Sequence, residues 1–136
     1  EKGLTGQTYY ALALNWDLLP TELRPAATAH LVRLIRARGE HLATGFIGTP
    51  VLLPALRGAG QASLADRLLL SETFPSWLYQ VKIGATTMWE RWDGWTPEKG
   101  FQDAGMNSFN HYWLGCVTEY LHSAVAGIDT DGPGFK

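Results

Sequence analysis

Hydrophobic positions in this chain recur mostly every three or four residues, which predicts helices rather than strands. In the first segment, residues 7–18, Tyr10, Leu14 and Leu18 fall on one helical stripe. Pro20 disfavours helical backbone at the residue before it, so we expect this helix to end near residue 18.

The second predicted helix begins after Thr21, a favourable N-cap residue, and ends at Gly39, which suits a helix C-terminus. The arginines of this segment lie largely off its apolar stripe. The stripe consists of Ala27, Leu31, Leu34 and Ile35.

A glycine-punctuated loop is expected at residues 39–49, and Thr49-Pro50 then suits an N-cap followed by the first helical position. The last helix is expected to begin at Asn107 or Ser108, to end near Gly127 and to carry His111. The remaining helices are predicted at 51–56, 61–71 and 76–83.

One segment departs from the helical period. Residues 86–92 alternate and favour an extended strand, and Asp93-Gly94 follows as a turn. Together the segments predict an all-α fold of antiparallel helical hairpins with one short β segment near 86–92.

Composition excludes several classes of function. With 136 residues, 46% hydrophobic and 18% charged, the chain can form one packed domain. A net charge of -2 without a basic stripe argues against nucleic acid as a partner, and apolar runs of a few residues argue against a membrane span. Glu119 and His122 have metal-ligand spacing but no further ligand pattern, so we expect no metal and no cofactor. Cys116 is expected to be a buried structural thiol.

The most informative stretch is residues 86–97. It places Glu90, Arg91 and Asp93 among Trp89, Trp92 and Trp95. Aromatic faces beside carboxylates suit a sugar ring, because the rings cover its C–H surfaces and the carboxylates bind hydroxyls or perform chemistry. A core hairpin that turns at Asp-Gly is the alternative reading of the same residues.

Four motifs occur in an order and spacing that resemble one known family. They are Thr-Gly-Phe-Ile-Gly-Thr-Pro at 44–50, Pro-Ser-Trp-Leu-Tyr at 75–79, Gly-Ala-Thr-Thr-Met-Trp-Glu-Arg-Trp-Asp-Gly-Trp at 84–95 and Met-Asn-Ser-Phe-Asn-His-Tyr at 106–112. Over residues 4–128 the chain resembles the bacterial α-L-rhamnosidases of glycoside hydrolase family 78.

The resemblance implies an (α/α)6 toroid, six helical hairpins around a central cavity. Twelve helices of ordinary length need on the order of 200 residues. Residues 1–128 are therefore expected to be the C-terminal part of this catalytic domain, so the toroid is partial. Residues 129–136 resemble the linker to a β-sandwich that is missing here.

The resemblance also implies hydrolysis of terminal α-L-rhamnosyl groups with inversion. Glu90 matches the family's general base, and His111 matches a histidine that contacts the bound rhamnose. Trp92 and Trp89 are further candidate substrate-binding residues. On the residues alone, Glu90 is equally a structural carboxylate paired with Arg91, and a lone histidine such as His111 is more often structural.

The family's general acid belongs to an upstream motif, and neither Glu98 nor Asp103 matches it. A non-catalytic carbohydrate-binding or structural helical module, or an inactive truncation product, are therefore the alternatives to a glycosidase fragment. The expected ligands are rhamnose-containing glycosides. Self-association or docking with the missing part of the toroid is also expected. No signal peptide is visible, which favours a cytoplasmic location.

Overall fold

The computed structural model describes residues 6–130 of the chain. This range contains six α-helices and one two-stranded sheet, so the predicted helical class is confirmed. The helices are α1 Gln7–Asn15, α2 Arg24–Arg36, α3 Thr49–Gly58, α4 Ala62–Leu69, α5 Trp77–Lys82 and α6 Val117–Tyr120. The strands are β1 Trp95–Thr96 and β2 Gly100–Phe101.

Shorter helical turns occur at three places as 3-10 helix and at one as π-helix. They are Thr21–Leu23, Ala104–Met106, Trp113–Cys116 and the π-helical turn Leu121–Val125. None of the helices within residues 6–130 has the length and apolar character needed to cross a bilayer. Most of the predicted linker, residues 131–136, lies outside the described range, and the domain boundary at 128 stays a prediction.

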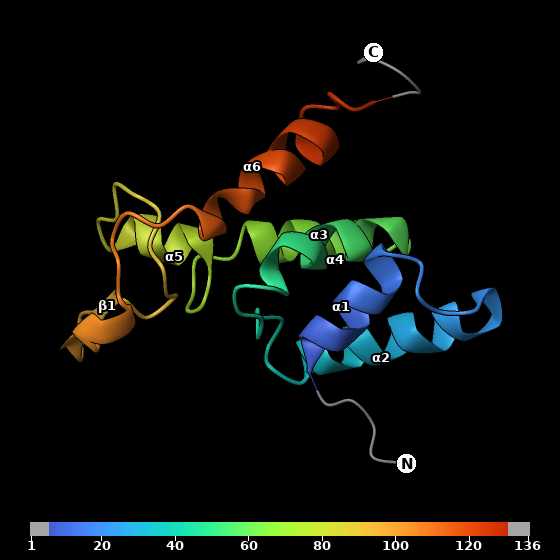
Figure 1. The fold of residues 1–136 in the computed structure, drawn as a ribbon, viewed down its shortest axis with the longest axis horizontal. Helices are drawn as coiled ribbons and strands as arrows, with labels where there is room; N and C mark the ends of the chain where they lie inside the picture. The colour runs from blue at the N-terminus through green and yellow to red at the C-terminus, as the bar shows by residue number, and fades with distance from the viewer. Residues whose placement is uncertain (1–5, 131–136) are drawn as a thin grey trace.

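The helices are arranged as successive antiparallel hairpins. Helices α1 and α2 lie side by side at one end of the molecule, and α3 and α4 lie in its middle (Figure 1). Helix α1 packs on α3, and α6 crosses α3 from the other side. Helix α5 and the β1–β2 hairpin lie at the opposite end from α2 (Figure 1).

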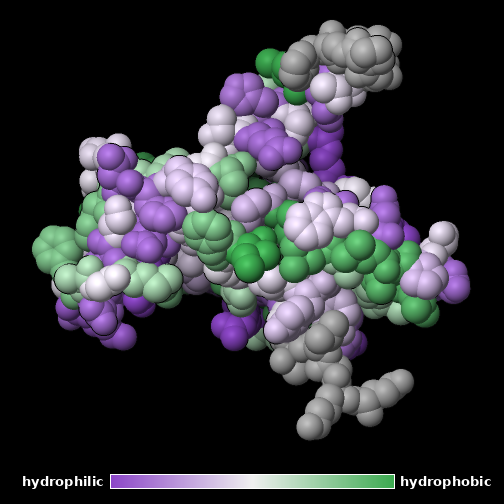
Figure 2. Space-filling model, in the orientation of Figure 1, coloured by the Kyte–Doolittle hydropathy of each residue, from purple (hydrophilic) through white to green (hydrophobic). Residues whose placement is uncertain are grey.

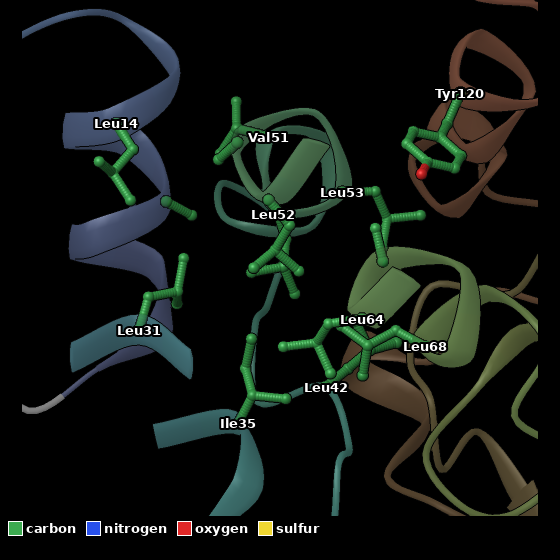
Figure 3. Packing of buried hydrophobic residues seen from close by; sticks show 14 of the residues in the cluster. Leu14, Leu31, Ile35, Leu42, Val51, Leu52, Leu53, Leu64, Leu68 and Tyr120 are labelled. Atoms are coloured by element: carbon green, nitrogen blue, oxygen red, sulfur yellow. The ribbon is translucent and has the colours of Figure 1, made fainter. Parts of the chain in front are cut away.

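The core lies where α1, α2, α3 and α4 meet. Leu31 and Ile35 from α2 point toward Leu52 from α3, and all three are fully buried (Figure 3). Each fully buried leucine or isoleucine contributes about 1.5–3 kcal/mol relative to an exposed one. Ala27, Leu31 and Ile35 of the predicted stripe are thus confirmed as core-facing, whereas Leu34 is only half-buried. Leu18, which the sequence placed on the first stripe, lies beyond α1 and is exposed.

Two predicted elements have other positions than expected. The β segment lies at 95–96 and 100–101, with Trp95 opposite Phe101, rather than at 86–92. The last helical stretch begins at Trp113, so residues 107–112 are not helical and His111 precedes that stretch instead of lying on it. Residues 88–90 make single backbone hydrogen bonds with 108–111 instead of a strand ladder, which accounts for both differences.

Candidate active site

Residues 88–90 lie beside residues 108–111. The N–H of Glu90 donates to the carbonyl of Ser108 at 2.8 Å, and the N–H of His111 donates to the carbonyl of Met88 at 2.8 Å. The hydroxyl of Thr87 also donates to the carbonyl of Phe109. These bonds use backbone groups that a helix over 107–112 would need for itself, which explains why that helix does not form. They also bring Glu90 and His111 onto neighbouring segments.

The Glu90 side chain is half-buried and held by backbone. Its Oε2 accepts a hydrogen bond of 2.8 Å from the N–H of Ser108. Its own carbonyl oxygen accepts a hydrogen bond of 2.6 Å from the indole Nε1–H of Trp113. The pairing of Glu90 with Arg91 considered from the sequence is not made; the Arg91 guanidinium donates instead to Asp93. Side chain and main chain of Glu90 are therefore both fixed.

Glu90 lines a pocket of about 370 Å³ between the loop before α3 and the segment before β1. Trp92 and Trp113 form aromatic parts of its wall, and Phe46 extends the wall from the loop. The other lining residues are Leu42, Ala43, Thr44, Gly45, Phe74, Pro75, Arg91, Asp93 and Met106. A mostly apolar wall with a few charged groups has the composition of a small-molecule site.

Trp92 is held from three sides. Its Nε1–H donates to the carbonyl of Thr44 at 3.2 Å, and its ring packs edge-on against Trp77 at 5.1 Å. The side-chain amide of buried Gln80 donates to the carbonyls of Arg91 and Trp92. In the extended strand expected over 86–92, Glu90 and Trp92 would lie on one side. They do share the pocket, but Arg91 and Asp93 line it too, since the chain turns between 91 and 94.

Arg91 and Asp93 form a bidentate ion pair in this wall. The guanidinium Nε and an Nη donate to the two carboxylate oxygens at 2.9 and 3.1 Å. Through these hydrogen bonds Arg91 holds the pKa of Asp93 below its ordinary value of 3.8, and Asp93 raises the pKa of Arg91. Asp93 is therefore an ionised carboxylate at neutral pH.

His111 does not line the pocket directly. Its ring packs edge-on against Phe46, with centroids 5.9 Å apart, and Phe46 does line the pocket. His111 also stacks on the exposed ring of Tyr112 at 5.2 Å. The imidazole is thus separated from the pocket with Glu90 by one aromatic ring.

Trp89 has a different position from Trp92. It is 6% exposed, and its ring packs edge-on against Phe109 at 4.9 Å, outside the residues that line the pocket. Contact of Trp89 with a sugar stays a prediction. In the structure Trp89 packs on Phe109, next to the segment that carries Glu90.

The site contains residues that the sequence did not single out. Phe46 contacts three consecutive residues, His111, Tyr112 and Trp113, at centroid distances of 5.9, 6.0 and 5.3 Å. The N–H of Ser108 binds the Glu90 carboxylate. Phe46 and Ser108 both lie inside the quoted motifs, so the motifs were the available signal. Trp113 follows the last motif directly.

The other candidates have structural surroundings. The imidazole of His41 is hydrogen-bonded to the carbonyl of Arg38 and the hydroxyl of Thr73, which links the end of α2 to the loop before α5. Cys116 is half-buried rather than buried as expected, and this burial raises the pKa of its thiol to about 11. Within residues 6–130, Glu119 and His122 belong to no group of side chains suited to a metal ion.

Comparisons with known proteins agree on one family. Residues 2–125 match the sequence model described as the bacterial alpha-L-rhamnosidase 6 hairpin glycosidase domain. An alpha-L-rhamnosidase of Streptomyces avermitilis is 50% identical over 130 residues, which are 96% of this chain and 13% of the relative. An alpha-L-rhamnosidase of an Alteromonas species is 44% identical over 135 residues, 99% of this chain and 15% of the relative.

The fold agrees as well. The crystal structure of a Streptomyces avermitilis alpha-L-rhamnosidase complexed with L-rhamnose matches 96% of this chain and 12% of its own chain, with 49% identity and a TM-score of 0.91. The chain thus spans about 13% of the length of the first curated relative.

Proposed function

The chain belongs to the family of bacterial alpha-L-rhamnosidase six-hairpin glycosidase domains, and on this premise we propose that it supplies the general base for hydrolysis of terminal α-L-rhamnosyl groups with inversion. The ligand class is supported by a homologous structure that holds L-rhamnose. The observation that carries the base role is the position of Glu90 on the pocket wall with one carboxylate oxygen already anchored.

Anchoring decides which atom does the chemistry. Oε2 of Glu90 accepts the N–H of Ser108, so Oε1 is the oxygen left to take a proton from water. A base must lie within about 2.6–3.2 Å of the proton-bearing atom, and a residue whose side chain and backbone are each held by a hydrogen bond keeps that distance at a smaller entropic cost. In an inverting glycosidase this water attacks the face of the sugar opposite the leaving oxygen.

Trp92, Trp89 and His111 complete the proposed binding site. Trp92 lines the pocket next to Glu90 and offers an aromatic face to the C–H surface of a sugar. Trp89 would keep the Glu90 segment in place from behind. His111 would offer an imidazole N–H to a sugar hydroxyl from the far side of Phe46.

The proton for the leaving oxygen has to come from another carboxylic acid. The pocket wall contains a second carboxyl group, that of Asp93. Because Arg91 lowers the pKa of Asp93, this carboxyl group is ionised and has no proton to donate. We therefore place the acid on residues other than those described.

A non-catalytic carbohydrate-binding module is the second candidate, favoured by the aromatic rings of Phe46, Trp92 and Trp113 in the pocket wall. Such a module needs the Trp92 wall but not the Glu90 carboxylate. Glu90→Gln distinguishes the two candidates, because it preserves size and hydrogen bonding and removes only the basic oxygen.

The test is a chimera. The matching 130 residues of the Streptomyces avermitilis enzyme are replaced by this chain, and hydrolysis of a natural rhamnoside is measured. Glu90→Gln is expected to abolish most turnover, and Glu98→Gln, on the exposed turn between β1 and β2, serves as the matched control. Equal turnover of the chimera and its Glu90→Gln variant would contradict the base role.

A further inference from the structure

Trp113 makes hydrogen bonds to both predicted site residues. Its indole Nε1–H donates to the carbonyl oxygen of Glu90 at 2.6 Å, and its backbone N–H lies 3.5 Å from Nδ1 of His111. The residue opens the 3-10 turn Trp113–Cys116 and is 5% exposed. Trp113 therefore contacts two residues, Glu90 and His111, that are 21 positions apart in sequence.

We propose that Trp113 is a positioning residue that fixes Glu90 and His111 relative to each other, an inference that rests on the proposed function. The two hydrogen bonds come from one rigid unit, since the indole has two side-chain torsions and its backbone is held in the 3-10 turn. A shift of His111 therefore moves the indole that holds Glu90.

The bond to His111 also sets the chemistry of the imidazole. A nitrogen that accepts a hydrogen bond carries no proton, so Nδ1 of the neutral ring is the acceptor and Nε2 carries the hydrogen. His111 then offers an Nε2–H donor, which suits a sugar hydroxyl oxygen. The opposite tautomer would break the contact with Trp113.

The Trp113 side chain also packs against other aromatic rings of the pocket wall. The Trp113 ring lies 5.3 Å from Phe46 and 6.3 Å from Trp92, and all three rings line the pocket. The chain offers a close comparison in Trp77, which is equally buried and whose Nε1–H donates to the carbonyl of Leu114 at 2.9 Å. Trp77 has the same kind of hydrogen bond but no hydrogen bond to Glu90.

The first experiment uses the unmodified 136-residue chain, with NMR signals followed through the titration of Glu90. We expect the Ser108 amide and the Trp113 indole N–H to shift with the Glu90 charge, and the Trp77 indole N–H to shift far less. The ¹⁵N shifts of His111 at about pH 9, where a histidine is neutral, should report the Nε2–H tautomer. A Trp113 indole signal that does not respond, or an Nδ1–H tautomer, would overturn the proposal without any variant.

The second experiment compares Trp113→Phe with Trp77→Phe, both checked by circular dichroism. Trp113→Phe should remove most of the response of the Ser108 amide to Glu90, and it should weaken L-rhamnose binding by roughly 2- to 10-fold, as expected for one lost hydrogen bond. Trp77→Phe should retain the response of the Ser108 amide, because Trp77 makes no hydrogen bond to Glu90. Equal losses in the two variants would show that only packing is involved.

The proposed function and the positioning role of Trp113 are contradicted by different results. Absence of L-rhamnose binding by the unmodified chain counts against the proposed function. A Ser108 response that persists in Trp113→Phe counts against the positioning role, whatever the sugar affinity is.

Discussion

The backbone N–H of Ser108 donates a 2.8 Å hydrogen bond to Oε2 of Glu90, across 18 positions of sequence. Because the donor is a main-chain group, no side-chain substitution at position 108 other than proline removes it. The geometry of the carboxylate therefore depends on where residues 107–112 run, not on the hydroxyl of Ser108.

In a chimera with the complementary part of a relative, Glu90→Gln should preserve the fold and lower turnover of a natural rhamnoside by about 10²–10⁴-fold, the usual contribution of general base catalysis. The reason is that the amide fits the Ser108 donor but does not accept a proton from water. Steady-state kinetics of both chimeras, with melting temperatures alongside, give the answer. Turnover within twofold of the parent would contradict the role.

The 136-residue chain alone should not hydrolyse a natural rhamnoside at a useful rate, because its pocket offers an ionised Asp93 where a carboxylic acid is needed. An aryl rhamnoside with a good leaving group needs little acid assistance and should show residual turnover. Both substrates are assayed with the purified chain and with its Glu90→Gln variant as control. Full activity on the natural substrate would mean that the acid lies within this chain.

Asp93→Asn should lower stability in a pH-dependent way. The Arg91 hydrogen bonds lower the pKa of Asp93 in the folded chain below 3.8. The ion pair therefore adds to the free energy of unfolding above pH 3.8, and this stabilisation is lost as the pH falls through the folded pKa. Both partners are partly exposed, so solvent screening keeps the contribution below about 1 kcal/mol. Urea unfolding at about pH 7 and about pH 3 measures it.

The difference in free energy of unfolding between the parent chain and Asp93→Asn should be largest near neutral pH and smaller in acid. Glu98→Gln, on the exposed turn between β1 and β2, is the control and should show a smaller difference. If this difference for Asp93→Asn grows as the pH falls, the Arg91–Asp93 ion pair does not stabilise the fold in the expected way.

Cys116 should react slowly with iodoacetamide. Burial raises its pKa from 9.0 to about 11, so the thiolate is about 100-fold scarcer than in a thiol at the ordinary value. Mass spectrometry at about pH 8 follows the alkylation, first in the native chain and then in denaturant. Equal rates in the two states would show that the thiol is not protected by burial.

The isolated chain should self-associate. Several large apolar side chains are exposed, including Trp16 at 58%, Leu18 at 66% and Leu70 at 65%, and apolar surface is visible across the middle of the molecule (Figure 2). Contiguous apolar surface favours association in water. Size-exclusion chromatography across a concentration series is the measurement, with Leu18→Lys expected to reduce the association. A monomer at every concentration would contradict the prediction.

The helical part of the fold was predictable because its signal is local. The stripe of Ala27, Leu31 and Ile35 gave both the existence and the buried face of α2, since a 3.6-residue period is a property of neighbouring residues. The N-caps were less predictable: the expected caps Thr21 and Thr49 lie inside helical turns, because α2 follows Leu23 and α3 follows Gly48. The family motifs pointed to Glu90, which the structure places in the pocket wall.

Residues 86–112 were decided by tertiary contacts instead. Periodicity favoured a strand at 86–92 and a helix from 107 or 108, but the backbone of Glu90 and His111 bonds across these segments, and no local pattern encodes such pairing. The same contacts bring Trp113 to Glu90 and Phe46 to His111. The sequence by itself indicated the candidate side chains for the chemistry, and only the packed chain decided their distances, because hydrogen bonds and ring contacts between distant segments form when those segments dock.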